Sequence, residues 1–209
     1  MVMQSSINGL GSAYASAFTA TSRVKVFAMC PMDAIASGVA TFCSQNYGAG
    51  DSGRISAGFR IGNIAGALYG ALVGVLLFFF GRSACLIFLS ASETQILDSC
   101  AMFLRYNSYF FWLLGLLNVT RITVQSLGFS GRAIFSGVME MIARISIALL
   151  LVPRIGFEAI CLSDPAAWIA ADLYILPTGL YVMHKVRILL KQQKEEKEKH
   201  CTNLVGRLA

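Results

Sequence analysis

The sequence predicts an all-α protein that lies in a lipid bilayer, as a polytopic bundle of about five complete membrane-spanning helices. Of its 209 residues, 56% are hydrophobic and only 13% are charged, and the mean hydropathy is +0.65. The apolar residues form long blocks, and residues 61–80 contain no charge over a length that spans the hydrocarbon core as a helix. A soluble domain has about twice this share of charge and buries one compact core, which these blocks do not fit.

Four further apolar blocks complete the set of predicted spans. They are residues 26–50, which Asp33 interrupts, 106–120, 133–152 and 157–183. With the nearest turn signals as limits, the blocks predict helices at residues 13–45, 53–80, 93–126, 132–152 and 155–190. Pro31 should bend the first helix because it lacks a backbone donor, and Asp164-Pro165 should disturb the last. Residues 191–209 are rich in charge and predict a solvated, disordered tail.

Composition also excludes several classes of protein. The net charge of +6 comes from residues at helix ends and in the tail, without the aromatic-interleaved basic face that nucleic-acid binding needs. The six cysteines form no C-x-x-C pair and the two histidines lie near and in the tail, so no metal site is expected. No Walker A loop, H-E-x-x-H, G-x-S-x-G or paired catalytic carboxylates occur, so nothing indicates an enzyme or an ATP-driven pump.

Glycines recur at every fourth position of the predicted helix at residues 53–80. They are Gly58, Gly62, Gly66, Gly70 and Gly74, and we call them the glycine ladder. This spacing places them on one helix face, where a neighbouring helix can approach closely in lipid. A role in helix packing is favoured, and a sliding surface for a moving transporter is the alternative.

Ionisable residues inside apolar blocks are candidates for a substrate or ion pathway, because a charge at bilayer depth is costly unless it faces protein or water. Glu140 and Arg144 lie one helical turn apart and can pair, either as a structural ion pair or as part of a polar path. Asp33 follows Pro31 by two residues, where a kink can admit water, although local donors could equally satisfy it. Asp172 is a similar carboxylate for which a structural role is favoured.

Two amides end the first predicted helix. Gln45 and Asn46 precede the turn formed by Gly48, Ala49 and Gly50. Amides at such a place can bond the neighbouring backbone, so a structural role is favoured over contact with a ligand.

Several stretches of the chain together resemble the second lobe of the multidrug and toxic compound extrusion (MATE) family. They are Gln4-Ser-Ser-Ile-Asn8-Gly-Leu-Gly11, Thr41-Phe-Cys-Ser-Gln45-Asn46-Tyr-Gly48-Ala49-Gly50 with Arg54-Ile55, Arg121-x-x-x-Gln125-Ser-Leu-Gly128-Phe-Ser-Gly131-Arg132, and Glu140-x-x-x-Arg144. Trp168 sits where the last helix of the family often has a tryptophan. The Gln-Asn-x-Gly-Ala segment is the most specific piece, and the resemblance covers residues 1–187.

The resemblance implies a secondary antiporter that exports organic cations or drugs in exchange for H⁺ or Na⁺, with no other cofactor. Family members have twelve helices in two six-helix lobes, and access alternates as one lobe rocks against the other. On that map, residues 1–190 hold the end of helix seven and helices eight to twelve, as one lobe whose first helix is truncated. Residues 191–209 form the tail. Transport would then need the missing amino-terminal lobe, or a second copy of the chain, as a partner.

The same map gives roles to the polar candidates and leaves alternatives open. Asp33, Glu140 and Arg144 would face the central cavity. The supporting amides would be Gln4, Asn8, Gln45 and Asn46. A related lipid-linked flippase remains an alternative, although such transporters carry several basic residues in the cavity, and so does an inert truncated membrane scaffold.

Orientation rests on the tail. The basic residues of the loops are balanced between the two sides, and only those at residues 185–199 tip the count. Because basic residues gather on the cytoplasmic side, we expect a multi-pass protein of the plasma membrane with a cytoplasmic tail.

Overall fold

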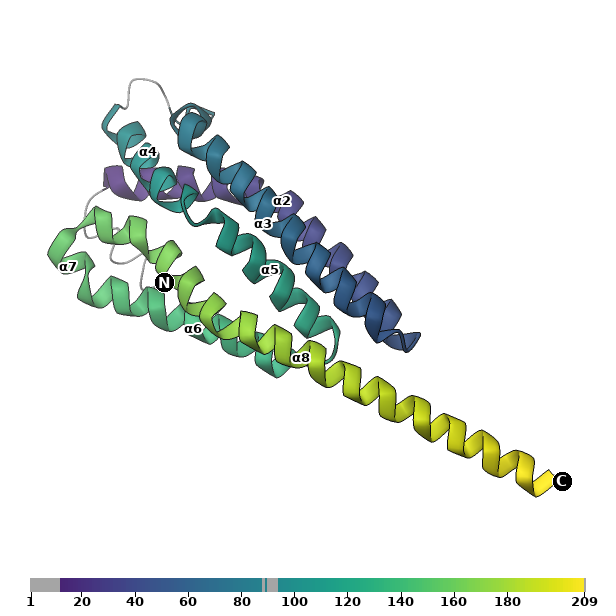
Figure 1. Cartoon of the computed structure of the whole chain (residues 1–209). Coiled ribbons are helices and arrows are strands. Elements are labelled where there is room, and N and C mark those ends of the chain that lie inside the picture. The colour runs from purple at the N-terminus through teal and green to yellow at the C-terminus, as the bar shows by residue number, and fades with distance from the viewer. Residues whose placement is uncertain (1–11, 88, 90–93, 209) are drawn as a thin grey trace.

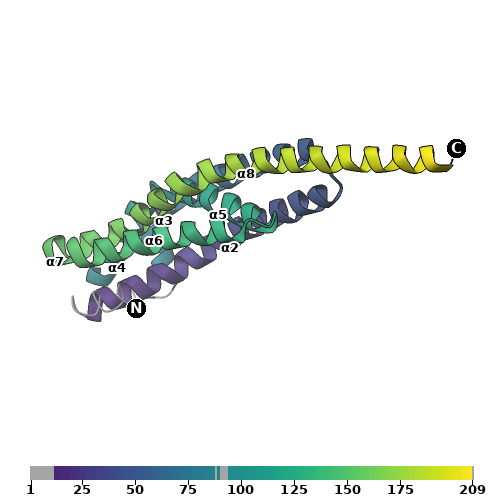
Figure 2. The same cartoon turned by 90° about the horizontal axis from the view of Figure 1, so that it is seen from below.

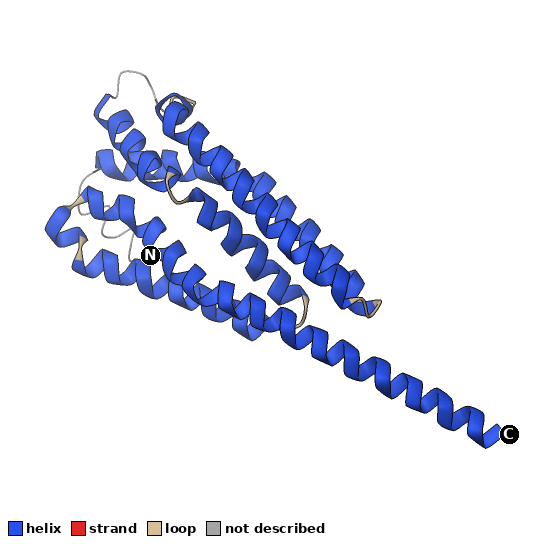
Figure 3. Cartoon of the chain, in the orientation of Figure 1, coloured by secondary structure: helices blue, strands red, loops and turns tan. Residues whose placement is uncertain are grey.

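The computed structural model describes residues 12–87, 89 and 94–208, and nearly all of them are helical (Figure 3). The helices are α2 (Ser12–Gly48), α3 (Ser52–Cys85), α4 (Thr94–Ser108), α5 (Phe111–Ser126), α6 (Ser130–Leu150), α7 (Val152–Ile155) and α8 (Phe157–Leu208). No strand occurs within these described ranges. The prediction of an all-α fold is therefore confirmed.

The long helices run back and forth, so that neighbours in the chain lie side by side (Figure 1). Helices α2 and α3 form one antiparallel pair, α6 and α8 form another, and α5 contacts members of both. The α2–α3 and α5–α6 connections lie at one end of the bundle, which we call the turn end, and α7 lies at the other. The last part of α8 projects beyond the turn end, as Figure 2 also shows.

Four helical segments are long and apolar enough to cross a bilayer. They are Tyr14–Gly48, Ser52–Cys85, Ser130–Leu150 and Phe157–Glu196. Large apolar side chains cover their outer faces, and Phe27, Phe79 and Leu173 are each more than 70% exposed. A lipid environment suits such a surface, because exposure of this much apolar area to water is unfavourable. The prediction of a membrane helix bundle is confirmed.

The predicted single helix at residues 93–126 is wrong, because the structure divides it into α4 and α5. The backbone N–H of Phe110 donates to the Asn107 carbonyl at 3.1 Å, three residues back, so the regular helical ladder stops there. The side chains of Asn107 and Ser108 also donate to backbone carbonyls of their own turn, at 2.9 and 2.7 Å. Such bonds compete with the helical ladder for acceptors. The two short helices follow one another along the bundle in place of one continuous span (Figure 1).

The other predicted helices occur with shifted ends. Helix α3 continues to Cys85 instead of ending at residue 80. Pro31 lies inside α2, which changes direction part-way along its length in Figure 1, as expected of an interior proline. Helix α8 continues through both Pro165 and Pro177, so Asp164-Pro165 does not interrupt it.

The glycine ladder lies on the face of α3 that touches its neighbours. Toward its amino-terminal end Gly58 faces the side chain of Phe42 and Gly62 faces that of Val39, both on α2. Further along, a Cβ atom added at Gly70 would lie 2.5 Å from the backbone oxygen of Phe111, and one added at Gly74 would lie 2.5 Å from that of Ser108. Gly115 of α5 meets Gly66 in the same way, backbone to backbone. Helices α3 and α5 can pack this closely only because no side chain separates them.

The segment predicted to be a disordered tail is helical as far as Leu208. Its lysines, glutamines and glutamates have high helix propensity, and Lys191, Glu195 and Lys199 place opposite charges four residues apart. The side chains of residues 191–196 are exposed, so this part of the helix is solvated. The predicted truncated helix at residues 1–11 lies outside the described residues.

Candidate functional site: a charged network inside the bundle

Glu140 and Arg144 of α6 form the ion pair that their spacing predicts, and the pair is part of a larger network. Arg144 Nη1 lies 3.1 Å from Glu140 Oε2. The other carboxylate oxygen of Glu140 accepts from the guanidinium of Arg121 on α5. Arg121 Nε also donates to the Ser136 hydroxyl at 2.9 Å, and this bond fixes the direction of the guanidinium. One carboxylate therefore joins α5 to α6.

The network continues from Arg144 to α8 and α2. Arg144 donates from Nε to Asp164 Oδ1 at 3.3 Å, and its Nη2 lies at the same distance from that oxygen. The second oxygen of Asp164 accepts from Lys25 Nζ on α2. Acidic and basic side chains thus alternate from Arg121 to Lys25 across four helices.

The charges in this network are mostly withdrawn from solvent. The side chains of Glu140 and Asp164 are 12% and 9% exposed, whereas that of Arg144 is 36% exposed. Each carboxylate contacts two cations, and a buried charge is tolerated when it is paired and hydrogen-bonded in this way. Three cationic and two anionic groups leave a net charge of +1 on the network.

Asp172 lies beside this network without joining it. The residue is only 3% exposed, and neither carboxylate oxygen has a hydrogen-bond partner among the described residues. Arg121 and Glu140 are the charged groups whose fields act on it. An ionised Asp172 would bring the total charge of the six groups to zero. Buried polar atoms without a partner are rare in folded proteins, so this carboxylate is a candidate for a functional role.

Asp33 is separate from the network, but α5 connects the two. The carboxylate of Asp33 is on the exposed face of α2 and accepts from the side-chain amide of Asn118. Asn118 precedes Arg121 by three residues, so both project from one face of α5. No basic side chain among the described residues forms an ion pair with Asp33. It is an exposed carboxylate, with a neutral partner, in an apolar helix.

The structure does not bring the predicted amides to this place. Asn46 is buried at the carboxy-terminal end of α2, where its side chain donates to the Phe42 carbonyl at 2.8 Å. Gln45 is exposed beside it. Twelve residues of helix separate Gln45 from Asp33, which is about 18 Å. Gln4 and Asn8 lie outside the described residues.

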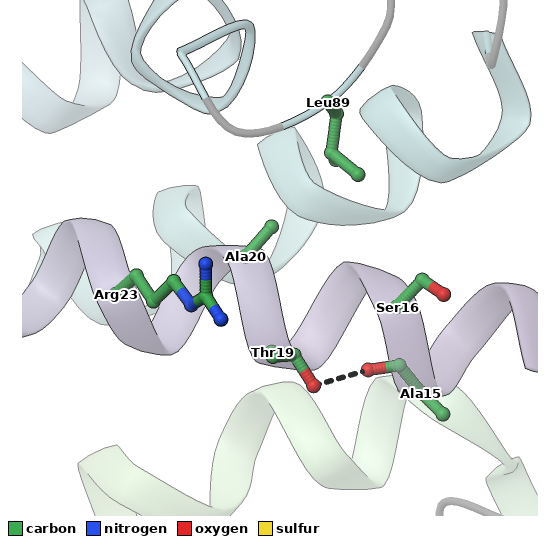
Figure 4. Close-up of a pocket in the computed structure, with 6 residues that line it drawn as sticks. All are labelled: Ala15, Ser16, Thr19, Ala20, Arg23 and Leu89. Atoms are coloured by element: carbon green, nitrogen blue, oxygen red, sulfur yellow. Dashed lines mark hydrogen bonds between the residues drawn. The ribbon is translucent and has the colours of Figure 1, made fainter.

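A small open cavity lies against the amino-terminal part of α2 (Figure 4). Its volume is about 330 Å³, and it is lined by Ala15, Ser16, Thr19, Ala20, Arg23 and Leu89. The Thr19 hydroxyl donates to the Ala15 carbonyl of its own helix at 2.9 Å, so it is not directed at a ligand. The cavity is mostly walled by small side chains and does not include any residue of the charged network.

Lys25, Arg121 and Asp164 were not among the predicted site residues. Their contacts join positions 139, 20 and 19 residues apart, and no spacing rule in a single sequence reveals such pairs. Arg121 is part of a motif that resembles the family, and this motif is the one feature of the sequence that could have indicated Arg121 as a site residue. The described residues contain no group of three or more His, Cys, Asp or Glu that could hold a metal ion.

Comparison with known proteins agrees with a membrane transporter. The MatE family model matches residues 1–150, well over half of the 209-residue chain, and the matched stretch includes four of the five network residues. No curated protein and no solved structure matches the chain. A family match of this extent, on an apolar helix bundle with a charged interior, shows that the chain belongs to the MatE family of multidrug and toxic compound extrusion transporters.

Proposed function

We propose that this chain is the carboxy-terminal lobe of a secondary antiporter that exports organic cations or drugs in exchange for H⁺ or Na⁺. Family membership supports transport, and a carboxylate without a basic partner supports a cationic substrate. The single observation that carries the proposal is Asp33, an exposed carboxylate in a membrane helix with no basic partner among the described residues. An intramembrane carboxylate of this kind marks a substrate or ion pathway.

The role of Asp33 follows from electrostatics. In a low-dielectric setting a single negative charge attracts either an organic cation or the coupling ion, and one occupant excludes the other. Mutually exclusive occupancy of one carboxylate is the simplest basis for exchange. Asn118 holds the carboxylate in place and leaves its charge uncompensated.

The network has a different role in this proposal. It ties α2, α5, α6 and α8 together through paired charges, so it holds the helices in register while one lobe moves against the other. Asp172, beside Arg121, is a second acceptor for H⁺ within the same lobe. The partner lobe is an amino-terminal lobe or a second copy of this chain, in the plasma membrane, and the α8 tail faces the cytoplasm.

A lipid-linked flippase is the second candidate, because Lys25, Arg121 and Arg144 converge in one region. An anionic substrate needs basic groups that are free to receive it. Glu140 and Asp164 already pair with all three cations, so the network offers an anion little uncompensated charge. Asp33 adds a negative charge on the exposed side, and this favours a cation.

The test measures ethidium efflux from cells that lack other multidrug exporters. The chain is expressed with its upstream genomic DNA, so that any amino-terminal lobe is included. We expect efflux that depends on an H⁺ or Na⁺ gradient, and a loss of about tenfold or more in Asp33→Asn, because an intramembrane carboxylate contacts the cation directly. Asp98→Asn is the matched control, since Asp98 is an exposed aspartate paired with Arg82.

Each outcome has a definite meaning. If Asp33→Asn transports ethidium as well as the unmodified protein, Asp33 is not on the cation path. If the unmodified protein is present in the membrane but transports neither ethidium nor a lipid-linked anion, the protein is an inert membrane scaffold. Transport of the anion alone would establish the flippase.

A further inference from the structure

A second polar cavity lies at the turn end of the bundle, between α8 and the α2–α3 turn. Its volume is about 680 Å³. Gly48, Ala49 and Gly50 of the α2–α3 turn line it on one side, and Arg187, Lys191 and Lys194 of α8 line it on the other. Arg187 follows Asp164 by 23 residues of α8, which is about 34 Å of helix. This cavity is therefore separate from the charged network.

Three basic side chains face the cavity from one side of α8. Arg187, Lys191 and Lys194 are four and three residues apart, so they project from one helix face together with Leu190. Leu190 is buried and packs in the cluster that contains Ile55 of α3, which places this face toward the α2–α3 turn. The three basic side chains are exposed.

Within the cavity lining, the positive charge of this face exceeds the negative charge. None of the three residues forms an ion pair there. Asp51 is the acidic residue in the lining, where it caps α3 by accepting from the Arg54 N–H at 3.0 Å, so one negative charge stands against three positive charges. Like charges at this spacing destabilise a helix, so an anion bound between them would be stabilising.

The wall opposite the basic face is built from small residues. A Cβ atom added at Gly48 or Gly50 would meet no atom within 4 Å, so the turn leaves space on its outer side. Gly50 has a φ of +77°, a conformation that favours glycine. Ser52 begins α3, and backbone N–H groups in the first turn of a helix have no partner within the helix. The segment most typical of the MATE family thus forms one wall of the cavity.

The depth of the cavity in the membrane identifies its occupant. On α8, Leu180 and Ile188 are 67% and 45% exposed, so lipid-facing residues reach the level of the cavity. The helix becomes strongly polar from Lys191 onward. A basic cavity at this boundary lies at the level of lipid headgroups, where anionic phospholipids are concentrated next to basic residues.

We propose that this cavity binds the phosphate headgroup of an anionic phospholipid. Arg187, Lys191 and Lys194 contact the phosphate, and the α2–α3 turn encloses the headgroup from the other side. The acyl chains extend along the lipid-facing surface of α8. The proposal does not depend on the transported substrate, because the cavity and the charged network share no residue.

The test is lipid retention in nanodiscs of phosphatidylglycerol and phosphatidylcholine with matched acyl chains. The protein is purified from the discs in mild detergent, and the bound lipid is quantified by native mass spectrometry. We expect the unmodified protein to retain phosphatidylglycerol preferentially. The triple variant Arg187→Gln, Lys191→Gln, Lys194→Gln should lose roughly tenfold or more of this preference, because each basic residue contributes to headgroup binding.

A control variant separates a specific site from general surface charge. Arg54→Gln, Arg132→Gln and Lys185→Gln together remove the same formal charge from residues near the turn end that do not line the cavity. We expect this variant to keep the preference within about twofold, since it leaves the cavity charges in place. An equal loss in both triple variants would overturn the proposal and show that only net charge matters.

A second variant tests the cavity itself without any change of charge. Ala49 is an exposed residue of the cavity wall, and Ala49→Trp would fill the space opposite the basic face. Retention of phosphatidylglycerol should fall in this variant as in the basic triple variant. Unchanged retention would overturn the proposal. Displacement of the lipid by inorganic phosphate as readily as by phosphatidylglycerol would also overturn it, in favour of a site for free phosphate.

Discussion

Asp164 is the residue on which the charged network depends most. Its two carboxylate oxygens contact cations from two different helices, Lys25 of α2 and Arg144 of α6, and its side chain is only 9% exposed. The Lys25 side chain is 17% exposed, so neither charge of this pair is well hydrated. The contribution of such a pair to stability is clearest when one partner is removed, because the other is left as an uncompensated charge.

At this scale we predict that Asp164→Asn lowers the free energy of unfolding by about 2 to 4 kcal/mol, the cost of leaving a largely buried cation without its partner. The measurement is unfolding in mixed micelles. Lys25→Met added to Asp164→Asn should recover part of the loss, because it removes the stranded ammonium. The exposed Arg82–Asp98 pair supplies the control, and Asp98→Asn should cost less than about 1 kcal/mol. Equal losses in the two aspartate variants would contradict the buried network.

The same residues show how far the candidate site could be predicted from the sequence. The Glu140–Arg144 pair follows from two positions on one face of a helix, and local geometry is enough to predict it. The Lys25–Asp164 contact depends on how α2 packs against α8, and helix packing is not encoded in any local spacing. For Asp172 the sequence favours a structural role, and the absence of a hydrogen-bond partner becomes visible only after the helices are placed.

At the scale of helices, the contact between α3 and α5 stands out because it is made by backbone. Gly66, Gly70 and Gly74 of α3 face the backbone of Gly115, Phe111 and Ser108. The last two of these residues flank the break between α4 and α5. The break therefore lies within the stretch where the α3 backbone is in close contact with its neighbours, and the tightest approach is at Gly115 and Gly66. In lipid, where no hydrophobic force drives helices together, such contact is a main source of stability.

We predict that Gly70→Ala destabilises the bundle by about 1 to 3 kcal/mol, because the new methyl group would lie 2.5 Å from the Phe111 oxygen and force the helices apart. The melting temperature in detergent is the measurement. Gly137→Ala of α6 is the matched control, since a Cβ there meets nothing within 4 Å. That control should be neutral or slightly stabilising, because alanine favours helix over glycine. Equal melting temperatures for the two variants would show that the α3–α5 contact is loose.

The helices themselves were predictable to different degrees. The glycine ladder is periodic, so its common face is apparent from spacing alone. The break between α4 and α5 has no proline or glycine at Tyr109 and Phe110, and the polar residues next to it, Asn107 and Ser108, are equally compatible with a continuous helix. The break between α4 and α5 is accompanied by contact with α3, and the local sequence does not predict it. Conversely, the charged segment after residue 190 is too polar for a core, but its residues favour helix.

At the scale of the whole molecule, charge is unequal at the two ends of the bundle. The turn end carries Arg54, Arg132, Lys185, Arg187, Lys191 and Lys194, whereas the half of the bundle with α7 has Arg23, Arg82, Arg105 and Arg154. The α2–α3 turn, the α5–α6 turn and the polar part of α8 are on the same side, so their charges add. Basic residues close to membrane spans are retained on the cytoplasmic side. The surplus at the turn end comes from the basic residues of α8, and it favours an orientation with this end in the cytoplasm.

We therefore predict that a cysteine introduced at Gln193 resists a membrane-impermeant maleimide in intact cells and reacts after lysis. A cysteine at Glu158, an exposed residue at the start of α8 near the opposite end, should react in intact cells. Cys30 is the native cysteine exposed among the described residues and is replaced by alanine beforehand, as is Cys201 of the tail. Labelling at Gln193 but not at Glu158 would show that the protein has the opposite orientation in the membrane. The turn end would then face the outside of the cell, against the positive-inside rule. The proposed lipid site would lie in the outer leaflet.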